Sequence, residues 1–383
     1  MRNVFSTSGG AVVPRPGAPS HAAQPAPTLL PTPEMLQRQY PATAQVLATV
    51  ATGRQQARAI LDRQDSRLLV IVGPCSIHDP HAAWDYACLL AELARELSAS
   101  MCILMRVYFE KPRTTLGWKG LLHDPRLDGS AGMDEGLAAA RQLLVHVNML
   151  GLPAATELLH PLTVAWLGDL LSWAAIGART TESQVHRELA SGLPMPVGFK
   201  NGTDGDVGIA LQALQASAVP HALPGIDMQG RAIVQHTQGN AHAHLVLRGG
   251  SQGPNYDAAS IARACAMLDE KRLSRRMVVD CSHANCGKQA ARQADVLRDV
   301  VAQRCAGRQA LRGVMLESFL VGGNQVLGAD PRTLRYGCSI TDPCLDWPAT
   351  ASLLREAHQR LQAAACAPFM HAAPEMVPVR PWV

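Results

Sequence analysis

Four side chains of types that bind transition metals stand in short polar stretches of the sequence. They are Cys75 in Val-Gly-Pro-Cys-Ser, His283 in Ser-His-Ala-Asn, Glu317 after Val-Met-Leu, and Asp342 in Ser-Ile-Thr-Asp. A thiolate, an imidazole and two carboxylates suit Mn²⁺, Fe²⁺, Co²⁺ or Zn²⁺ better than Mg²⁺. Such an ion, with an open position, polarises a carbonyl group. Spacing alone leaves simpler explanations open, namely a buried structural cysteine and a helix-capping or core histidine.

A second group of chemically active residues is cationic. It consists of Arg106, Lys111, Arg113, Arg179, Lys200 and Arg248. Any one of these residues is ordinarily a surface ion-pair partner. If they converge on one cavity they repel each other, so the ligand must carry several negative charges, and arginine forks suit phosphate and carboxylate. We therefore expect phosphorylated, carboxylated small molecules as ligands.

The elements that would bring these residues together are eight short apolar runs separated by longer helical segments. The runs are Leu68–Val72, Met101–Val107, Ala154–Leu158, Ala174–Ala178, Pro196–Phe199, Leu245–Leu247, Met277–Val279 and Val314–Leu316. This alternation is typical of βα units, and eight of them predict a closed (β/α)8 TIM barrel in the α/β class. A functional residue type stands at the C-terminal end of each run, where barrel enzymes place their active sites. In chain order these residues are Cys75, Arg106, Glu157, Arg179, Lys200, Arg248, His283 and Glu317.

The rest of the chain predicts additions to this barrel. Residues 1–33 are rich in Pro and Ala and indicate a flexible arm, and residues 34–66 an N-terminal helical extension with helices at about 33–40 and 42–63. The barrel is expected over 67–362, with an inserted β-hairpin at about 219–237 between the fifth and sixth strands. Residues 363–383 form a C-terminal tail without an assigned role.

Composition excludes several classes of protein. A hydrophobic share of 47% and a charged share of 17% in 383 residues are typical of a globular protein. No apolar run reaches membrane-spanning length and no secretory signal is apparent, so we expect a cytoplasmic protein without a membrane partner. The net charge of +4 is scattered, which disfavours nucleic acid as a partner. Ten cysteines without a CxxC pair predict reduced thiols and no disulfide framework.

Longer motifs carry a resemblance to a known family. They are Val-Gly-Pro-Cys-Ser-Ile-His-Asp (72–79), Met-Arg-Val-Tyr-Phe-Glu-Lys-Pro-Arg-Thr-Thr (105–115), Gly-Trp-Lys-Gly-Leu (117–121), Trp-Ala-Ala-Ile-Gly-Ala-Arg-Thr-Thr-Glu-Ser-Gln (173–184), Gly-Phe-Lys-Asn-Gly-Thr-Asp-Gly (198–205), Leu-Arg-Gly-Gly (247–250), Ser-His-Ala-Asn (282–285) and Ser-Ile-Thr-Asp (339–342). From about residue 35 to 360 the chain resembles the type I 3-deoxy-D-arabino-heptulosonate 7-phosphate (DAHP) synthases of the shikimate pathway, a barrel family.

The resemblance implies a metal-dependent condensation of phosphoenolpyruvate with erythrose 4-phosphate that releases phosphate. It makes Cys75, His283, Glu317 and Asp342 the ligands of one divalent transition metal ion. It also implies the substrate-binding residues. For phosphoenolpyruvate, Arg179 and Lys200 hold the phosphate, Arg106, Lys111 and Arg248 surround the carboxylate and reacting end, and Glu157, Gly177 and Ala178 complete the pocket. For erythrose 4-phosphate, Arg113 and Thr114 hold the phosphate. Arg106, Lys111, Glu157, Lys200 and His283 are the implied catalytic residues, and the proton-transfer group stays open between Lys111 and a metal-bound water near Asp342 or Glu157.

Regulation is where the sequence departs from the family's usual pattern. The arm, the insertion and the region around residues 189–194 build the family's site for aromatic amino acid inhibitors, so Leu189, Leu193 and Pro194 are effector candidates. Pro194 replaces a usual serine and lacks its hydroxyl and N–H groups. We hypothesise weakened or altered inhibition by phenylalanine and tyrosine, with tryptophan as the alternative effector. The family also implies a homodimer or homotetramer.

Two other functions agree with part of this sequence pattern. The first is 3-deoxy-D-manno-octulosonate 8-phosphate synthase, which shares the barrel and the use of phosphoenolpyruvate; the Lys-Pro-Arg-Thr-Thr segment (111–115) argues against it. The second is a catalytically silent paralogue that only binds metabolites or a partner. Such a copy would have lost a metal ligand or Lys200, and all of these are present.

Overall fold

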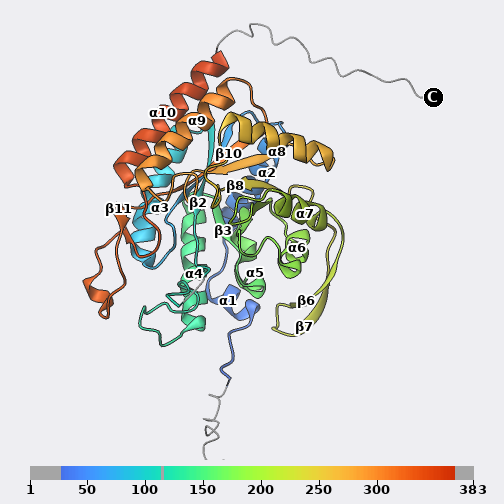
Figure 1. The fold of residues 1–383 in the computed structure, drawn as a ribbon. Coiled ribbons are helices and arrows are strands. Elements are labelled where there is room, and N and C mark those ends of the chain that lie inside the picture. Colours follow the sequence, from blue (N-terminus) through green and yellow to red (C-terminus); the bar gives the residue numbers. More distant parts are fainter. Residues whose placement is uncertain (1–26, 114–115, 367–383) are drawn as a thin grey trace, which may run out of the picture. The chain divides into compact units, whose positions relative to one another are not determined.

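A closed barrel of eight parallel strands forms the centre of the protein in the computed structural model, which describes residues 27–113 and 116–366 (Figure 1). The strand order around the barrel is β1-β10-β9-β8-β5-β4-β3-β2. The bounds are β1 Leu68–Gly73, β2 Met101–Arg106, β3 Ala154–Glu157, β4 Trp173–Ile176, β5 Val197–Lys200, β8 His244–Leu247, β9 Met277–Asp280 and β10 Leu311–Glu317. The predicted fold class is therefore confirmed.

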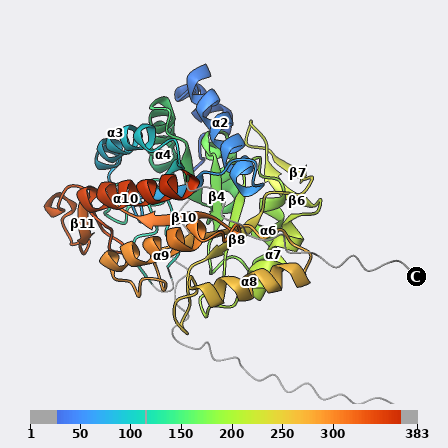
Figure 2. The same ribbon diagram turned by 90° about the horizontal axis from the view of Figure 1, so that it is seen from above.

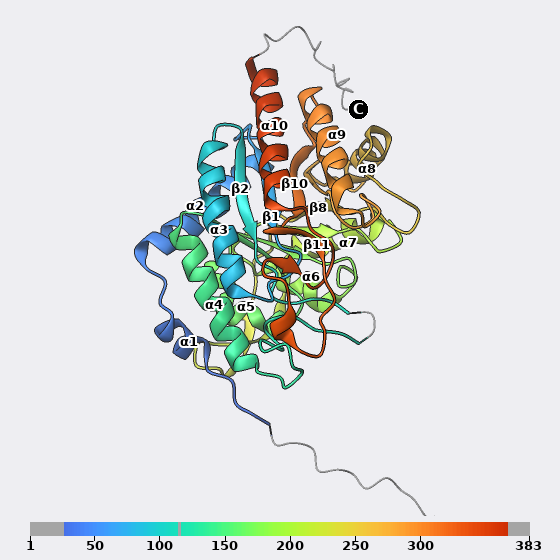
Figure 3. The ribbon, with the colours of Figure 1, turned by 90° about the vertical axis from the view of Figure 1, so that its left-hand side faces the viewer.

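Helices alternate with these strands and lie around them (Figure 2). The α-helices are α1 Pro33–Gln39, α2 Ala44–Leu61, α3 Pro80–Glu96, α4 Met133–Met149, α5 Val164–Leu167, α6 Gln184–Ser191, α7 Gly208–Ser217, α8 Ala258–Glu270, α9 Gln293–Cys305 and α10 Trp347–Cys366. Short 3₁₀ turns occur at Pro161–Thr163, Gly168–Leu170, Ala290–Arg292 and Pro331–Thr333. Helices α9 and α10 pack side by side against the outside of the barrel (Figure 3).

The strands are apolar on both faces because helices cover the outside and side chains fill the inside. Every residue of β1 is buried, as expected for a parallel strand covered on both faces. At the N-terminal end of the barrel, Ala57 and Ile60 of α2 join the cluster of inward-facing residues that includes Leu69 and Trp173. The predicted N-terminal helical extension thus closes the end of the barrel opposite the strand C-termini. Thr43 begins α2 by accepting a hydrogen bond from the Val46 N–H group.

Two small sheets lie outside the barrel. The antiparallel hairpin β6 (Ala222–Ile226) and β7 (Ala232–His236) lies between β5 and β8 in the chain, where the inserted hairpin was predicted. A short parallel pair, β11 (Val321–Asn324) and β12 (Cys338–Ser339), follows β10 and was not predicted. This pair carries the chain from the end of β10 back toward the barrel mouth before α10 begins.

Other predictions from the sequence have mixed outcomes. Nine cysteines whose side chains the structure describes are free thiols, namely Cys75, Cys88, Cys102, Cys265, Cys281, Cys286, Cys305, Cys338 and Cys344. Within the described residues, no helix is long and apolar enough to cross a membrane. Most of the predicted arm and tail lies outside the described residues, and the proposed domain boundaries stay predictions.

A neutral histidine is built into the N-terminal half of the barrel interior. His244 is 1% exposed, its Nδ1 atom lies 2.9 Å from the carbonyl oxygen of His242, and its Nε2 atom accepts a hydrogen bond from Trp173 Nε1 at 3.2 Å. Nδ1 therefore carries the proton, because Nε2 must offer a lone pair to the indole N–H. Burial lowers the pKa of His244 to about 4, because a charged ring would have no contact with solvent. Protonation of Nε2 would also break the hydrogen bond from Trp173.

This shift predicts a pH-dependent stability. The folded pKa of about 4 lies below the ordinary 6.5, so His244 stabilises the fold fully above about pH 6.5 and loses this contribution as the pH falls toward 4. At about 1.4 kcal/mol per pKa unit, the loss is about 3 kcal/mol. In urea unfolding, the stability difference between the wild type and His244→Gln should shrink by this amount between about pH 7.5 and pH 4. A difference that does not change with pH would contradict the assignment.

Candidate active site

A cavity of about 830 Å³ opens at the C-terminal ends of the barrel strands. Side chains from the loops after β2, β3, β4, β5, β8 and β9 line it, as expected for the mouth of a barrel. The predicted site residues on its wall are Arg106, Lys111, Arg113, Glu157, Gly177, Ala178, Arg179, Lys200, Arg248, His283 and Asp342. The structure therefore brings together the cations that the sequence placed at separate strand ends.

Three of the four predicted metal ligands form a compact group at one edge of this cavity. The ligand atoms of Cys75, Glu317 and Asp342 all lie within 4.8 Å of one another. Atoms bound to one ion at about 2.0–2.3 Å lie within about 4.6 Å of each other, so the group fits a single metal ion after small adjustments. The Ser76 and Thr341 hydroxyls, 2.7 Å apart, tie together the two loops that carry Cys75 and Asp342.

The fourth predicted ligand, His283, stands beside this group and is not a member of it. It lines a small cavity together with Glu317 and Asp342. Its Nδ1 atom lies 2.7 Å from Ser282 Oγ and 3.0 Å from Asp280 Oδ2, while its Nε2 atom makes no hydrogen bond within the described part of the chain. The backbone φ of His283 is +57°, in the left-handed region where non-glycine residues are uncommon and often functional.

Lys111 contacts both the thiol of Cys75 and the carboxylate of Asp342, which themselves lie 3.3 Å apart. Its Nζ atom lies 2.9 Å from Cys75 Sγ and 3.4 Å from Asp342 Oδ2. Burial alone would lower the pKa of Lys111, but Cys75 and Asp342 raise it above its ordinary value. Burial and the nearby Glu317 raise the pKa of the Cys75 thiol to about 12. For Asp342, Lys111 and His283 outweigh burial and lower the pKa of the carboxyl group. The Asp342 carboxylate and the Lys111 ammonium are therefore both charged, so a cation is already favoured at the place where a metal ion would bind.

Arg106 is the most deeply buried cation of the site, with an exposed fraction of 0%. Its guanidinium donates to Glu317 Oε1 at 3.0 Å and to the carbonyl oxygen of Pro74 at 3.2 Å. It also stacks on the ring of Tyr108, 3.8 Å from the centroid. With so many bonds inside the protein, Arg106 holds Glu317 in place and presents a fixed positive charge to the cavity.

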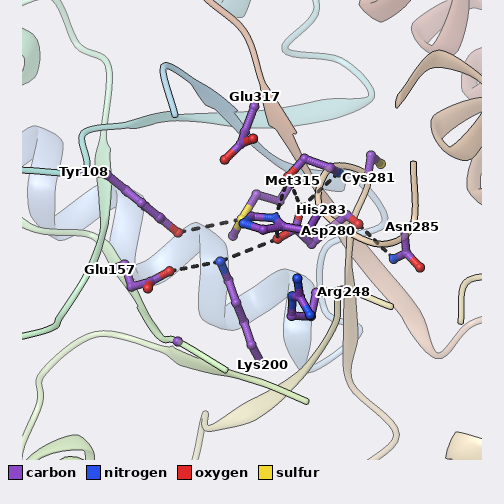
Figure 4. A network of polar contacts seen from close by, with 12 residues as sticks. Tyr108, Glu157, Lys200, Arg248, Asp280, Cys281, His283, Asn285, Met315 and Glu317 are labelled. Atoms are coloured by element: carbon purple, nitrogen blue, oxygen red, sulfur yellow. Dashed lines mark hydrogen bonds and ion pairs between the residues drawn. The ribbon is translucent and has the colours of Figure 1, made fainter. Parts of the chain in front are cut away.

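Lys200 lies between two buried carboxylates (Figure 4). Its Nζ atom is 2.9 Å from Glu157 Oε2 and 3.5 Å from Asp280 Oδ2. Burial would raise the pKa of Glu157, but Lys200 holds it below its ordinary value. Gly177 permits this packing, because a Cβ atom there would lie 2.4 Å from Glu157 Oε1. The lysine is therefore charged, immobilised and aimed at the cavity.

The remaining predicted cations are more open. Arg179 is exposed and its side chain makes no hydrogen bond or ion pair within the described ranges, so it is free to bind a ligand anion. Arg248 is half-buried, and Arg113 donates from Nε to the carbonyl oxygen of Trp118 at 2.8 Å. Thr114, also predicted to bind a substrate, lies outside the described residues.

The predicted effector residues lie away from the mouth, beside the hairpin. Leu189 and Leu193 are buried, whereas Pro194 is exposed and its carbonyl oxygen accepts a hydrogen bond from Arg58. Ser191 contacts Thr237, just after β7, through their hydroxyls at 2.7 Å. The segment and the hairpin thus form one packed region, and whether it binds an effector stays a proposal.

Sequence reasoning missed two residues of the site. Tyr108 was quoted only as part of a motif, yet its ring lies under Arg106 and 5.7 Å from Lys200. Asp280 was not singled out, although an aspartate directly after an apolar run is a signal that could have found it. Burial would raise the pKa of Asp280, but His283 and Lys200 hold it well below its ordinary value.

Comparisons with known proteins agree with this geometry. Residues 43–355 match the model of the DAHP synthetase I family. The chain is 49% identical over 333 residues to the Tyr-sensitive phospho-2-dehydro-3-deoxyheptonate aldolase of Escherichia coli, covering 87% of this chain and 93% of the relative. It is 50% identical over 328 residues to the Phe-sensitive enzyme of the same organism, covering 86% and 93%.

A solved structure is similar over nearly its whole length. The phospho-2-dehydro-3-deoxyheptonate aldolase of Francisella tularensis superposes with a TM-score of 0.86 at 41% identity, and the match covers 89% of this chain and 99% of that one. Fold and sequence therefore point to the same kind of enzyme.

The free guanidinium of Arg179 gives a direct test of the anion site. Removing one charged hydrogen-bond donor costs about 1.5–3 kcal/mol of binding, so Arg179→Gln should weaken inorganic phosphate binding by about 10-fold or more in calorimetric titration. The melting temperature should not change, because Arg179 bonds to no described residue. Arg308→Gln, at an exposed position outside the cavity, is the matched control and should bind phosphate like the wild type. Equal loss in both variants would refute a local site.

Proposed function

The chain belongs to the DAHP synthetase I family, and on this premise we propose how its residues carry out the family's reaction. It is a DAHP synthase, an enzyme of the first step of aromatic amino acid biosynthesis. This step condenses phosphoenolpyruvate with erythrose 4-phosphate, and the products are 3-deoxy-D-arabino-heptulosonate 7-phosphate and inorganic phosphate.

The proposed metal site consists of Cys75, His283, Glu317 and Asp342, which would hold one divalent ion, Mn²⁺, Fe²⁺, Co²⁺ or Zn²⁺. A bound ion supplies Lewis-acid chemistry toward the aldehyde of erythrose 4-phosphate. The soft thiol of Cys75 beside two carboxylates favours these ions over Mg²⁺. For His283 to join the other three, its free Nε2 atom must face the ion, and its Nδ1 contacts leave that atom available.

Phosphoenolpyruvate is proposed to bind across the floor of the cavity. Arg179 and Lys200 would hold its phosphate, and Arg106 and Arg248 its carboxylate, because a dianionic phosphate and a carboxylate need several fixed cations. The backbone at Gly177 and Ala178 completes the pocket. Glu157 holds Lys200 in place and would limit the positive charge that faces the substrate.

Erythrose 4-phosphate is proposed to bind above it, with its phosphate on Arg113 and Thr114. In the reaction, C3 of phosphoenolpyruvate forms a bond to the aldehyde carbon, water adds to C2, and the C2–O bond to phosphate then breaks. Lys111, whose contacts with Cys75 and Asp342 keep it protonated, would give a proton to the aldehyde oxygen as it becomes a hydroxyl. The cations hold two mutually repelling anions at reacting distance.

One observation carries this assignment. The compact group of Cys75, Glu317 and Asp342 adjoins the cavity on whose wall Arg106, Arg179, Lys200 and Arg248 converge. A site for a transition ion next to a site for phosphate and carboxylate is what the condensation requires. A silent paralogue would have no need for both.

The assignment predicts a strict dependence on the second substrate and on metal. Phosphate release from phosphoenolpyruvate should require erythrose 4-phosphate, disappear after chelation, and return with added Mn²⁺, Co²⁺, Fe²⁺ or Zn²⁺. Cys75→Ala, which removes the soft ligand, should lower metal affinity by at least about 10-fold. Full turnover in chelated protein, or none with added Mn²⁺, would refute the proposal. Faster turnover with arabinose 5-phosphate would instead favour the octulosonate alternative.

Regulation by aromatic amino acids is proposed to differ from that of the Tyr-sensitive and Phe-sensitive relatives. The chain is equally similar to both, so identity does not choose an effector. Pro194 lies where family members usually carry serine, and it offers a ligand neither a hydroxyl nor an N–H group. Leu189 and Leu193 are buried, which leaves the exposed Pro194 as the altered position that faces solvent.

We therefore expect weak inhibition by phenylalanine and tyrosine in the phosphate-release assay. Pro194→Ser should strengthen inhibition by one of them, because it restores a hydroxyl and a backbone donor at an exposed position. Tryptophan is the alternative effector, and its inhibition is measured in the same assay. Strong inhibition of the wild type by micromolar phenylalanine would overturn this proposal while leaving the catalytic assignment intact.

We also propose a cytoplasmic homodimer or homotetramer, on the resemblance to the family alone. Size-exclusion chromatography with light scattering distinguishes the two assemblies.

A further inference from the structure

Asp280 is a fully buried carboxylate, 0% exposed, at the last position of β9, and no step of the proposed reaction uses it. Such a group is expensive to bury unless several donors surround it. Its Oδ1 atom accepts hydrogen bonds from the backbone N–H of Ser282 at 3.0 Å and from Ser282 Oγ at 2.6 Å. Its Oδ2 atom faces His283 Nδ1 at 3.0 Å and Lys200 Nζ at 3.5 Å.

These contacts fix which nitrogen of His283 carries the proton. The Ser282 hydroxyl must donate to Asp280, because a carboxylate only accepts. Its oxygen is then the acceptor for His283 Nδ1, 2.7 Å away. Asp280 Oδ2 lies 3.0 Å from the same nitrogen, at ion-pair distance but without a hydrogen bond in the described structure, and its negative charge favours a proton on Nδ1. Nδ1 therefore carries the hydrogen, and Nε2 is left with its lone pair, as a metal-binding imidazole requires.

The same carboxylate acts on the other half of the site. Within the described residues, Lys200 has ion pairs with Glu157 at 2.9 Å and Asp280 at 3.5 Å, and of these two only Asp280 also makes direct contact with His283. Figure 4 shows Asp280 between Lys200 and His283, with Glu157 on the other side of the lysine. One buried charge thus adjoins both the candidate metal ligand and the candidate phosphate ligand.

We propose that Asp280 is a positioning residue that, together with Ser282, holds the His283 imidazole in its metal-binding tautomer and tempers the positive charge that Lys200 presents to the substrate phosphate. This inference rests on the proposed function, in which His283 binds the metal and Lys200 the phosphate. Its signature is a pair of opposite effects. Without the Asp280 charge the metal should bind more weakly, whereas an anion next to Lys200 is repelled less and should bind more tightly.

The test compares Asp280→Asn with two matched variants. Ser282→Ala removes the hydroxyl between His283 and Asp280 but leaves the charge, and Glu157→Gln removes the other carboxylate at Lys200 without touching His283. Co²⁺ affinity is measured by titrating chelated protein and following the visible absorption of the bound ion. Inorganic phosphate affinity is measured by calorimetry in the absence of metal.

In Asp280→Asn, Co²⁺ should bind about 10–100-fold more weakly and phosphate about threefold or more tightly. Ser282→Ala should weaken Co²⁺ and leave phosphate unchanged, whereas Glu157→Gln should strengthen phosphate and leave Co²⁺ unchanged. Wild-type Co²⁺ affinity in Asp280→Asn, or a fall in both affinities, would overturn the inference. If Asp280→Asn does not fold, the Ser282→Ala result decides, and unchanged Co²⁺ binding there counts against it. Wild-type protein that binds no Co²⁺ would instead refute the proposed metal site itself.

Discussion

Buried positive charge is the constraint on which the rest of the active site depends. Arg106, Lys111 and Lys200 are almost completely enclosed at the barrel mouth, and an isolated charge in such a place would cost several kcal/mol. Each therefore has an anionic or polarisable partner: Glu317 for Arg106, Cys75 and Asp342 for Lys111, and Glu157 with Asp280 for Lys200. Buried cations and anions are thus paired with one another at the barrel mouth.

This arrangement divides the cations into two kinds. The paired ones cannot move without leaving a carboxylate unpartnered, so they form a rigid frame whose charges are already oriented before a ligand arrives. The open ones, Arg179 and Arg248, keep donors free toward the cavity. Fixed, paired cations thus lie beside Arg179 and Arg248, which form no ion pair within the described residues. A substrate that carries a phosphate and a carboxylate would form ion pairs with these two arginines.

Much of this could be predicted from the sequence because barrels impose strong regularities. The apolar runs located all eight strands, since a strand covered on both faces must be apolar throughout, and the residue types at their C-terminal ends located the cavity. The inserted hairpin was visible as an interruption of the same alternation. Such features follow from local patterns that repeat along the chain.

What the sequence could not predict depends on irregular backbone. Asp342 reaches Cys75 through the short β11–β12 pair and the Ser76–Thr341 contact, neither of which has a periodic pattern. His283 adopts a left-handed conformation that its residue type does not suggest, and this places its ring next to the compact group of ligands and not inside it. A bulge in the pairing of β10 with β9 coincides with Arg312, which is buried with two nitrogen atoms unbonded in the described structure. The apolar pattern of a strand does not predict such a bulge or such a buried arginine.

The closing strands of the barrel give the compact ligand group one more consequence. Strand β1 pairs with β10, so Cys75 and Glu317 lie on the two sides of the line along which the barrel closes, and Asp342 comes later still. Cys75 and Asp342 are 267 residues apart in the chain, which a ribosome synthesising about 5–20 residues per second takes about 15–50 s to cover. During most of that time Cys75 has been made, but Glu317 and Asp342 have not. The group of Cys75, Glu317 and Asp342 can therefore form only after residue 342 has been synthesised. By then all eight barrel strands have been made, so a metal ion that binds this group would bind only a closed barrel.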